Sequence, residues 1–182
     1  MKLSTWEIDT THSSITFSVR HMVFAKVRGR FSAWTGSVQF DGADPTKGSV
    51  SVVIDASSID TGTADRDTHL RSGDFLDVAN FPELRFTSQS LESLGSDRYR
   101  LHGELTIRDT TRPVALEVTY NGQAQDPWGK QRAGFTATTS LDRREFGLAW
   151  NQVLEAGGVL VGEKIEIEIE IQAVNSAAAP AA

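Results

Sequence analysis

Cysteine is absent from this sequence of 182 residues, and its absence excludes several kinds of chemistry. The chain has no disulfide, no thiol nucleophile and no thiolate metal site. Long apolar runs are missing too, since none approaches the ~18 residues of a membrane-spanning helix. The N-terminus has no apolar stretch of the length that a signal peptide needs. We therefore expect a soluble, cytoplasmic protein, or a periplasmic or secreted one if a leader has been removed.

Positive charge is also scarce. The chain has 18 Lys and Arg residues against 24 Asp and Glu, which gives a net charge of -6. Nucleic-acid binding normally requires a basic face, and adsorption to anionic membranes through charge alone requires basic clusters. The composition argues against both. We expect residues 1–174 to form one domain, followed by a disordered, low-complexity tail at 175–182.

What the sequence does contain is a repeated alternation of apolar and polar residues, which is typical of β-strands. Ile15, Phe17 and Val19 alternate with polar neighbours, and the same pattern recurs up to a last strand in which isoleucines alternate with Lys164 and glutamates. About eight main strands with short turns predict an antiparallel barrel or sandwich. Several strands are long, which favours closure into an eight-stranded antiparallel β-barrel. The fold class is therefore all-β.

A charged segment interrupts this pattern and predicts a short helical insertion around 64–73. Thr63 is placed to cap the helix, and Asp65 and Asp67 suit the positive end of its dipole. His69 shares a helix face with Asp65, so we expect a surface salt link between them. A second, weaker helical turn is predicted near 150–155.

No motif for catalysis or metal binding accompanies these residues. The sequence has no HExxH, GxSxG, GxGxxG or GxxxxGK[ST] motif. His12 and Ser13 are neighbours, but adjacent residues on a strand point to opposite faces. We therefore predict no catalytic residue, no metal site and no cofactor, and hence a protein that is not an enzyme.

The apolar faces of the strands admit two interpretations. They either fill the core or line a tube around an apolar molecule, and the pattern alone favours the filled core because every barrel shows it. Two charged clusters are equally open. Arg66, Asp67 and His69 either recognise a ligand head group or tie the helix to the barrel rim, and Arg143 lies in a second such cluster.

Five motifs occur in order along the chain: DTTHSSITFSVRH, VRGRFSAWTGSVQFD, TADRDTHLRSGDFLDVANFPELRFTS, GELTIRDTTRPVALEVTYNG and SLDRREFG. Together they resemble a known family, the YceI-like polyisoprenoid-binding proteins. The resemblance covers about residues 5–173 and implies a lipocalin-like, eight-stranded antiparallel barrel with a helix near one end and a long apolar channel.

The resemblance favours the tube over the filled core. It implies binding of a long apolar isoprenoid lipid, such as a polyprenyl compound or an isoprenoid quinone, for carriage, storage or sequestration. The alternatives are an enzyme acting on a small apolar substrate in the same cavity, and a stress-related structural protein with a filled barrel; a homodimer is open. The residues expected to bind the ligand are Phe17, Val19, His21, Phe31, Val52, Arg66, Asp67, His69, Leu70, Phe75, Phe86, Leu105, Leu116, Phe135, Leu141, Arg143, Phe146 and Trp150.

Overall fold

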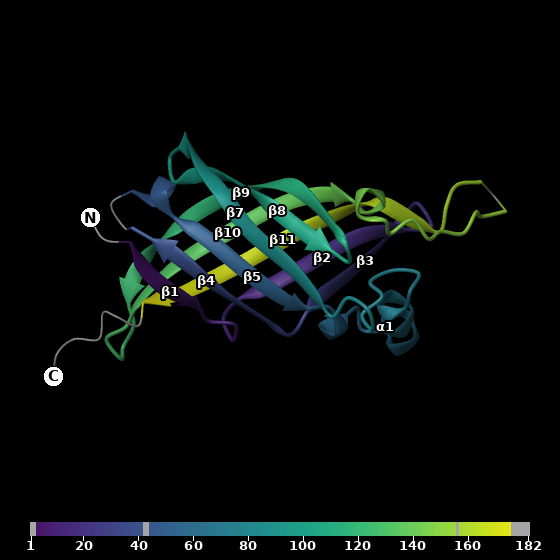
Figure 1. The fold of residues 1–182 in the computed structure, drawn as a ribbon, viewed down its shortest axis with the longest axis horizontal. Coiled ribbons are helices and arrows are strands. Elements are labelled where there is room, and N and C mark those ends of the chain that lie inside the picture. The colour runs from purple at the N-terminus through teal and green to yellow at the C-terminus, as the bar shows by residue number, and fades with distance from the viewer. Residues whose placement is uncertain (1–2, 42–43, 156, 176–182) are drawn as a thin grey trace.

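The chain folds into one antiparallel sheet that closes on itself (Figure 1). The computed structural model describes residues 3–41, 44–155 and 157–175. Its strands are β1 (Ser4–Ile8), β2 (Ser14–His21), β3 (Ala25–Phe31), β4 (Trp34–Phe40), β5 (Ser49–Asp55), β6 (Ile59–Asp60), β7 (Glu83–Gly95), β8 (Arg98–Ile107), β9 (Thr110–Gln125), β10 (Gln131–Asp142) and β11 (Val161–Asn175). The helical segments are α1 (Ala64–Arg71) and three short 3-10 turns, η1 (Pro45–Lys47), η2 (Ala56–Ser58) and η3 (Arg143–Phe146).

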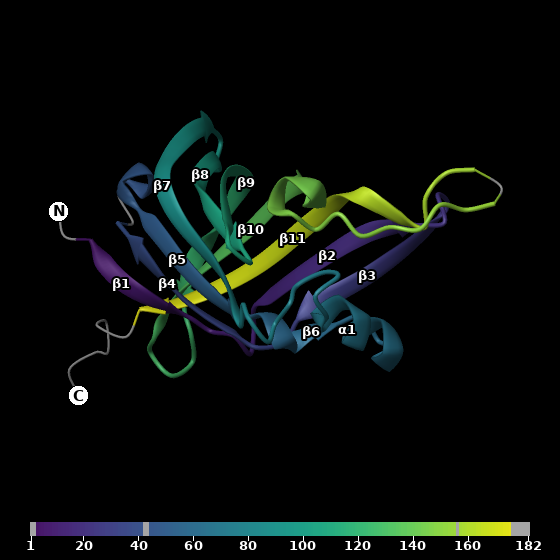
Figure 2. The same cartoon turned by 45° about the vertical axis from the view of Figure 1, so that its right-hand side comes forward.

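The closed ring has the strand order β1-β4-β5-β7-β8-β9-β10-β11, and β11 returns to β1. Trp6 of β1 lies opposite Asn175 of β11, which seals the ring. Further along, β11 pairs with β2, and β2 pairs with β3. The segments β1–β2 and β3–β4 thus act as two long, interrupted strands. The predicted eight-stranded antiparallel barrel is confirmed, and β2, β3 and β11 extend beyond β7–β9 (Figures 1 and 2).

The charged segment forms the predicted insertion as α1, which is the single α-helix among the residues that the structure describes. Thr63 stands at the N-cap, but its side chain makes no capping bond. The start of the helix is held instead by Asp67, which is buried and accepts hydrogen bonds from the Thr61 backbone N–H (2.9 Å) and hydroxyl (2.5 Å). Because it satisfies two donors, this carboxylate fixes the helix to the strand before it.

The helical turn predicted near 150–155 is wrong. The Asn151 side chain accepts from the Val161 N–H (3.0 Å) and donates to the Val161 carbonyl (2.7 Å). The Leu160 N–H also donates to the Gln152 carbonyl (2.8 Å). These bonds to the returning chain take the place of helical ones. A 3-10 turn forms slightly earlier, at η3.

The barrel interior is filled at one end. The rings of Trp6, Phe40, Tyr120 and Phe135 pack edge-to-face or tilted, with centroids 5.4–5.8 Å apart. Toward the other end the inward-facing side chains of β2 and β11, such as Phe17 and Ile167, are only half-buried. The glutamates of β11 face outward, as their alternation predicts. Of the predicted tail, Asn175 belongs to β11, and 176–182 lie outside the described residues.

Candidate functional site: an apolar cavity in the barrel

The half-buried side chains surround a cavity of about 330 Å³ inside the barrel. Apolar side chains from β2, β3, β5, β7, β8, β9, β10 and β11 form its wall, and α1 with the residues after it covers one side. The exposed Arg20 and the half-buried His21 also line it, so the cavity reaches solvent near the end of β2. Alternation along each strand turns one apolar face inward, and the cavity is the part of the interior that these faces do not fill.

Two glycines set the shape of the wall. A methyl group at Gly29 would lie 2.4 Å from the Phe17 ring, and one at Gly103 would lie 2.5 Å from the Phe86 ring. Each ring therefore lies over a glycine of the neighbouring strand, a packing that stabilises glycine within sheets. The absence of a side chain at these two positions keeps both rings against the wall and the centre of the barrel open.

An aromatic cluster stands beside α1 at the cavity boundary. The His69 ring packs against Trp150 (4.5 Å between centroids) and Phe75 (5.1 Å). Its Nε2 contacts the Asp74 carboxylate at 2.8 Å. The predicted link to Asp65 is wrong, because the turn after α1 brings Asp74 to the ring from the other side. His69 thus makes a polar contact with Asp74 and packs its ring against apolar side chains of the cavity wall.

Arg143 is the most buried cation of the site, with 4% of its surface exposed. Its guanidinium donates to four backbone carbonyls, those of Leu148 (2.6 Å), Trp150 (2.8 Å), Gly162 (2.8 Å) and Val161 (3.3 Å). Burial lowers the pKa of this guanidinium below its usual range, yet arginine stays protonated in proteins. The arrangement ties the loop after η3 to β11 and places a positive charge at the cavity wall.

Arg66 of α1 also lines the cavity. Its Nε donates to the Thr61 hydroxyl (2.7 Å) and its Nη2 to the Thr61 carbonyl (2.8 Å). No ion pair to Arg66 occurs within the described residues. The sequence left open whether this cluster recognises a ligand or ties the helix to the barrel. Asp67 only ties the helix to the barrel. Arg66 and His69 hold the helix and also line the cavity.

Most residues singled out from the sequence converge on this cavity, but three do not. Asp67 turns to Thr61, Phe135 packs with Phe40 at the filled end, and Phe146 is 1% exposed in the core beside η3. The residues that line the cavity are Phe17, Val19, His21, Phe31, Val52, Arg66, His69, Leu70, Phe75, Phe86, Leu105, Leu116, Leu141, Arg143 and Trp150.

Sequence reasoning missed other lining residues. The regular alternation of β11 could have identified its isoleucines, because they face the same side as their strand partners in β2. No sequence signal marks Leu160 or Val161, which reach the cavity only through the fold. The missed residues include Ile15, Ile54, Ile59, Leu76, Leu84, Ile107, Val114, Leu148, Leu160, Val161, Ile165, Ile167 and Ile169.

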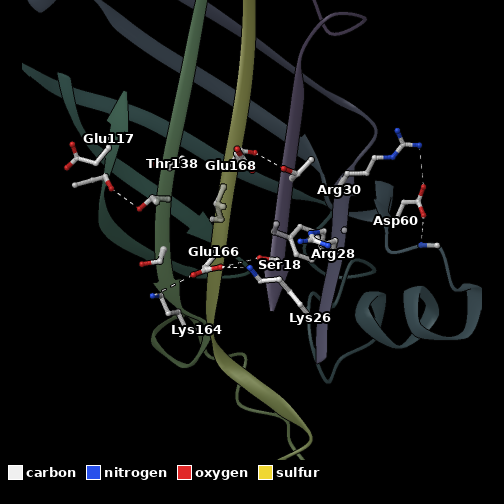
Figure 3. Close-up of a pocket in the computed structure, with 18 residues that line it drawn as sticks. Ser18, Lys26, Arg28, Arg30, Asp60, Glu117, Thr138, Lys164, Glu166 and Glu168 are labelled. Atoms are coloured by element: carbon white, nitrogen blue, oxygen red, sulfur yellow. Dashed lines mark hydrogen bonds and ion pairs between the residues drawn. The ribbon is translucent and has the colours of Figure 1, made fainter. Parts of the chain in front are cut away.

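A second hollow, of about 1100 Å³, lies on the outer face of β10, β11, β2 and β3 (Figure 3). Its side chains are mostly polar, and their charges are largely paired with one another: Glu166 contacts Lys26 (3.2 Å) and Lys164 (3.8 Å). Exposed pairs of this kind contribute little to stability and are typical of a solvated sheet face. We therefore place the candidate site in the apolar cavity.

Residues 3–41, 44–155 and 157–175 contain no group of three or more His, Asp or Glu side chains able to hold a metal ion. In the same residues, no helix is long and apolar enough to cross a membrane.

Comparison with known proteins decides the family. The family model of the YceI-like domain matches residues 6–173. The chain belongs to the YceI-like family. Among curated relatives, a UPF0312 protein of Shewanella baltica (strain OS185) is 41% identical over 137 residues, which cover 75% of this chain and 72% of that one. A UPF0312 protein of Pseudomonas savastanoi pv. phaseolicola is 37% identical over 137 residues, covering 75% and 71%.

Solved structures share the fold of this YceI-like chain at low identity. Burkholderia cenocepacia BcnA superposes with a TM-score of 0.78 at 22% identity, covering 91% of this chain and 98% of that one. A polyisoprenoid binding domain from Saccharophagus degradans, implicated in plant cell wall breakdown, has a TM-score of 0.72 at 14% identity and covers 98% and 100%. At these identities the likeness establishes the architecture alone.

Proposed function

We propose that this YceI-like protein binds a long apolar isoprenoid lipid, a polyprenyl compound or an isoprenoid quinone, inside its barrel. The observation that carries the proposal is the cavity itself: its wall is mostly apolar, it reaches solvent near the end of β2, and Arg66, His69 and Arg143 are among the few polar residues that line it. Ligand pockets typically combine a mostly apolar lining with a few polar groups that fix orientation. The polyisoprenoid-binding domain with the same fold supports this choice of ligand.

The expected affinity follows from the kind of contact. A tail of four isoprene units has about 20 carbon atoms, and drug-sized ligands gain roughly 0.3 kcal/mol per non-hydrogen atom, which gives about 6 kcal/mol. This corresponds to a Kd in the range of tens of micromolar. Longer tails bind more tightly as long as the cavity accommodates them, and head-group contacts at the open end add selectivity.

The two other functions raised by the sequence fit the cavity less well. A filled structural barrel requires an interior without a continuous cavity. An enzyme for a small apolar substrate requires a constellation of catalytic groups in the cavity. His21 and His69 line it, but within the described residues no carboxylate does. Binding, for carriage, storage or sequestration, therefore accounts for the lining better than catalysis does.

The test is extraction and native mass spectrometry of the protein purified from cells, followed by uptake of an added isoprenoid. Phe17→Asp places a charge on the cavity wall and should abolish uptake. Phe135→Leu is the matched control, because it alters an aromatic ring at the filled end and should leave uptake unchanged. A wild-type protein that carries no apolar molecule and takes up none would refute the proposal. Equal uptake by a folded Phe17→Asp variant would refute the assignment of the wall.

A further inference from the structure

The β2–β3 hairpin ends in three exposed apolar residues. Met22, Val23 and Phe24 are 41%, 66% and 80% exposed, and Val153 in the adjacent loop is 78% exposed. The loop packs against the hairpin: the Met22 N–H donates to the Leu160 carbonyl (2.9 Å), and a methyl group on Gly158 would lie 3.4 Å from Val23. These four residues are called the apolar tip below. Single exposed apolar residues are common, but a cluster on a projecting element marks an interaction site.

The backbone holds this tip in an uncommon conformation. Met22 and Val23 have φ values of 52° and 72°. Such values are rare for residues other than glycine, and rarest for a β-branched residue such as valine. Strained backbone of this kind is concentrated at functional sites. The Phe24 N–H donates to the Met22 carbonyl (2.9 Å). Because this backbone pair is already hydrogen-bonded, moving the turn out of water costs less free energy.

The tip lies at the open end of the cavity. His21 comes directly before it and lines the cavity, as does Leu160, which accepts the Met22 hydrogen bond. The hairpin and the neighbouring loop project together beyond β7–β9, away from β1 and from the turn between β9 and β10 (Figures 1 and 2). A molecule that contacts the apolar tip is therefore close to the cavity entrance.

Cationic side chains flank the tip. Arg20 and Lys26 face each other across the hairpin just behind it, and Arg28 follows on β3. Lys26 pairs with Glu166, whereas the ion pairs of the described residues include neither Arg20 nor Arg28. Glu155 in the loop and Glu166 beside Lys26 carry the opposing charges. The local balance thus differs from the net charge of -6 of the whole chain.

We propose that the apolar tip docks on the surface of a lipid bilayer. The four side chains expose on the order of a few hundred Å², less than the roughly 800 Å² that each partner buries in a stable protein–protein interface. A narrow hairpin end suits a bilayer instead, where apolar side chains enter the headgroup boundary and nearby cations meet anionic lipids. The inference rests on the proposed function, since a docked tip would let a lipid pass from the bilayer to the cavity with little exposure to water.

The experiment is flotation of the purified protein with vesicles of phosphatidylcholine, and of phosphatidylcholine with phosphatidylglycerol. The test variant is Val23→Asn with Phe24→Ser, because asparagine tolerates positive φ and the fold is then preserved. The matched control is Trp128→Ser: this tryptophan is 79% exposed, in the turn between β9 and β10. We expect the double variant to lose roughly tenfold or more in vesicle partitioning, the control to match the wild type, and anionic lipid to strengthen binding.

Uptake of a short-chain isoprenoid quinone delivered from ethanol is measured in parallel. The double variant should retain it, because the tip is not part of the cavity wall. If the wild type takes up no quinone, the proposed function is refuted. Vesicle flotation would still test separately whether the apolar tip binds a bilayer. Wild-type protein that fails to float with either vesicle, or a double variant that floats equally well, overturns the docking proposal. The docking proposal is also overturned if the wild type is a dimer that does not bind vesicles and the double variant is a monomer. That result would assign the apolar tip to a protein interface.

Discussion

Enlarging one side chain inside the cavity should affect stability and lipid binding in opposite directions. Val19 of β2 is half-buried and lies between Val27 of β3 and Ile165 of β11, which also line the cavity. Val19→Phe adds about four carbon atoms at this point. If they enter unoccupied apolar space, the gain for the delipidated protein is about 0.5 to 2 kcal/mol, the range seen for cavity filling.

The same carbon atoms take space from the ligand. Displacing an equal number of contacts costs the ligand about 1 to 3 kcal/mol, at up to ~0.8 kcal/mol for each methylene-sized group. Isoprenoid binding should therefore weaken roughly 5- to 150-fold, because each 1.4 kcal/mol is tenfold. Urea unfolding of delipidated protein measures the first effect, and titration with a fluorescent isoprenoid measures the second.

The matched control is Ser18→Phe, which places the same ring on the neighbouring residue at the outer face. It should leave isoprenoid binding unchanged. A well-packed core would instead be overfilled by Val19→Phe and lose about 1 to 3 kcal/mol of stability. Destabilisation of that size with unchanged lipid binding would refute the existence of usable space at Val19.

Two further predictions concern the groups that hold the barrel ends. Arg143→Met leaves four carbonyls without their donor, so it should lower the free energy of unfolding by about 3 kcal/mol in urea titration; a loss below about 1 kcal/mol would show that water replaces the guanidinium. The Asp9 carboxylate has its pKa lowered from 3.8 to about 2 by a hydrogen bond from Arg132 and then by His12. Because the folded pKa is the lower one, this stabilisation is present above about pH 4 and lost as pH falls toward 2. Asp9 is 18% exposed, so we discount the shift to about 1 to 2 kcal/mol, and Arg132→Gln should flatten the change in unfolding free energy over that pH interval.

The sequence predicted the parts of this structure that depend on local pattern. A period of two fixes which residues of a strand face inward, and this is why the strands of the barrel and the interruption at α1 were anticipated. The pattern cannot separate a filled interior from a cavity. Phe17 and Phe135 occupy equivalent places in alternating strands, yet only Phe17 lines the cavity. Phe135 meets Phe40 and Tyr120, and those contacts join residues far apart in the chain.

Arg143 shows a second limit of local reasoning. Its sequence context left its role in the charged cluster open, although the family resemblance placed it among the residues expected to bind the ligand. Its partners lie in a loop and in the first residues of β11, none of which has a recognisable motif. A buried guanidinium with carbonyl partners is a property of the assembled fold, because the desolvation that it requires is offset only when the carbonyls converge. The exposed apolar tip is likewise not predicted by the sequence, because no motif marks Met22, Val23 and Phe24 between the two alternating segments.

The position of the cavity follows from where the hydrogen-bond ladders end. Pairing of β10 with β11 continues to Asp142, but pairing of β10 with β9 stops at Thr138. The first part of β9 therefore has β8 as its ladder partner and leaves β10 free to diverge. The gap is bridged by single contacts, from the Thr139 hydroxyl to the Ala115 carbonyl (2.8 Å) and from Arg112 to the Glu145 carbonyl (3.2 Å). The cavity lies where this ladder has ended, because Leu116 of β9 and Leu141 of β10 line it. The rings of Tyr120 and Phe135, by contrast, meet where β9 and β10 are paired. The alternation is the same at both ends, so the pairing of β9 with β10 is what distinguishes them.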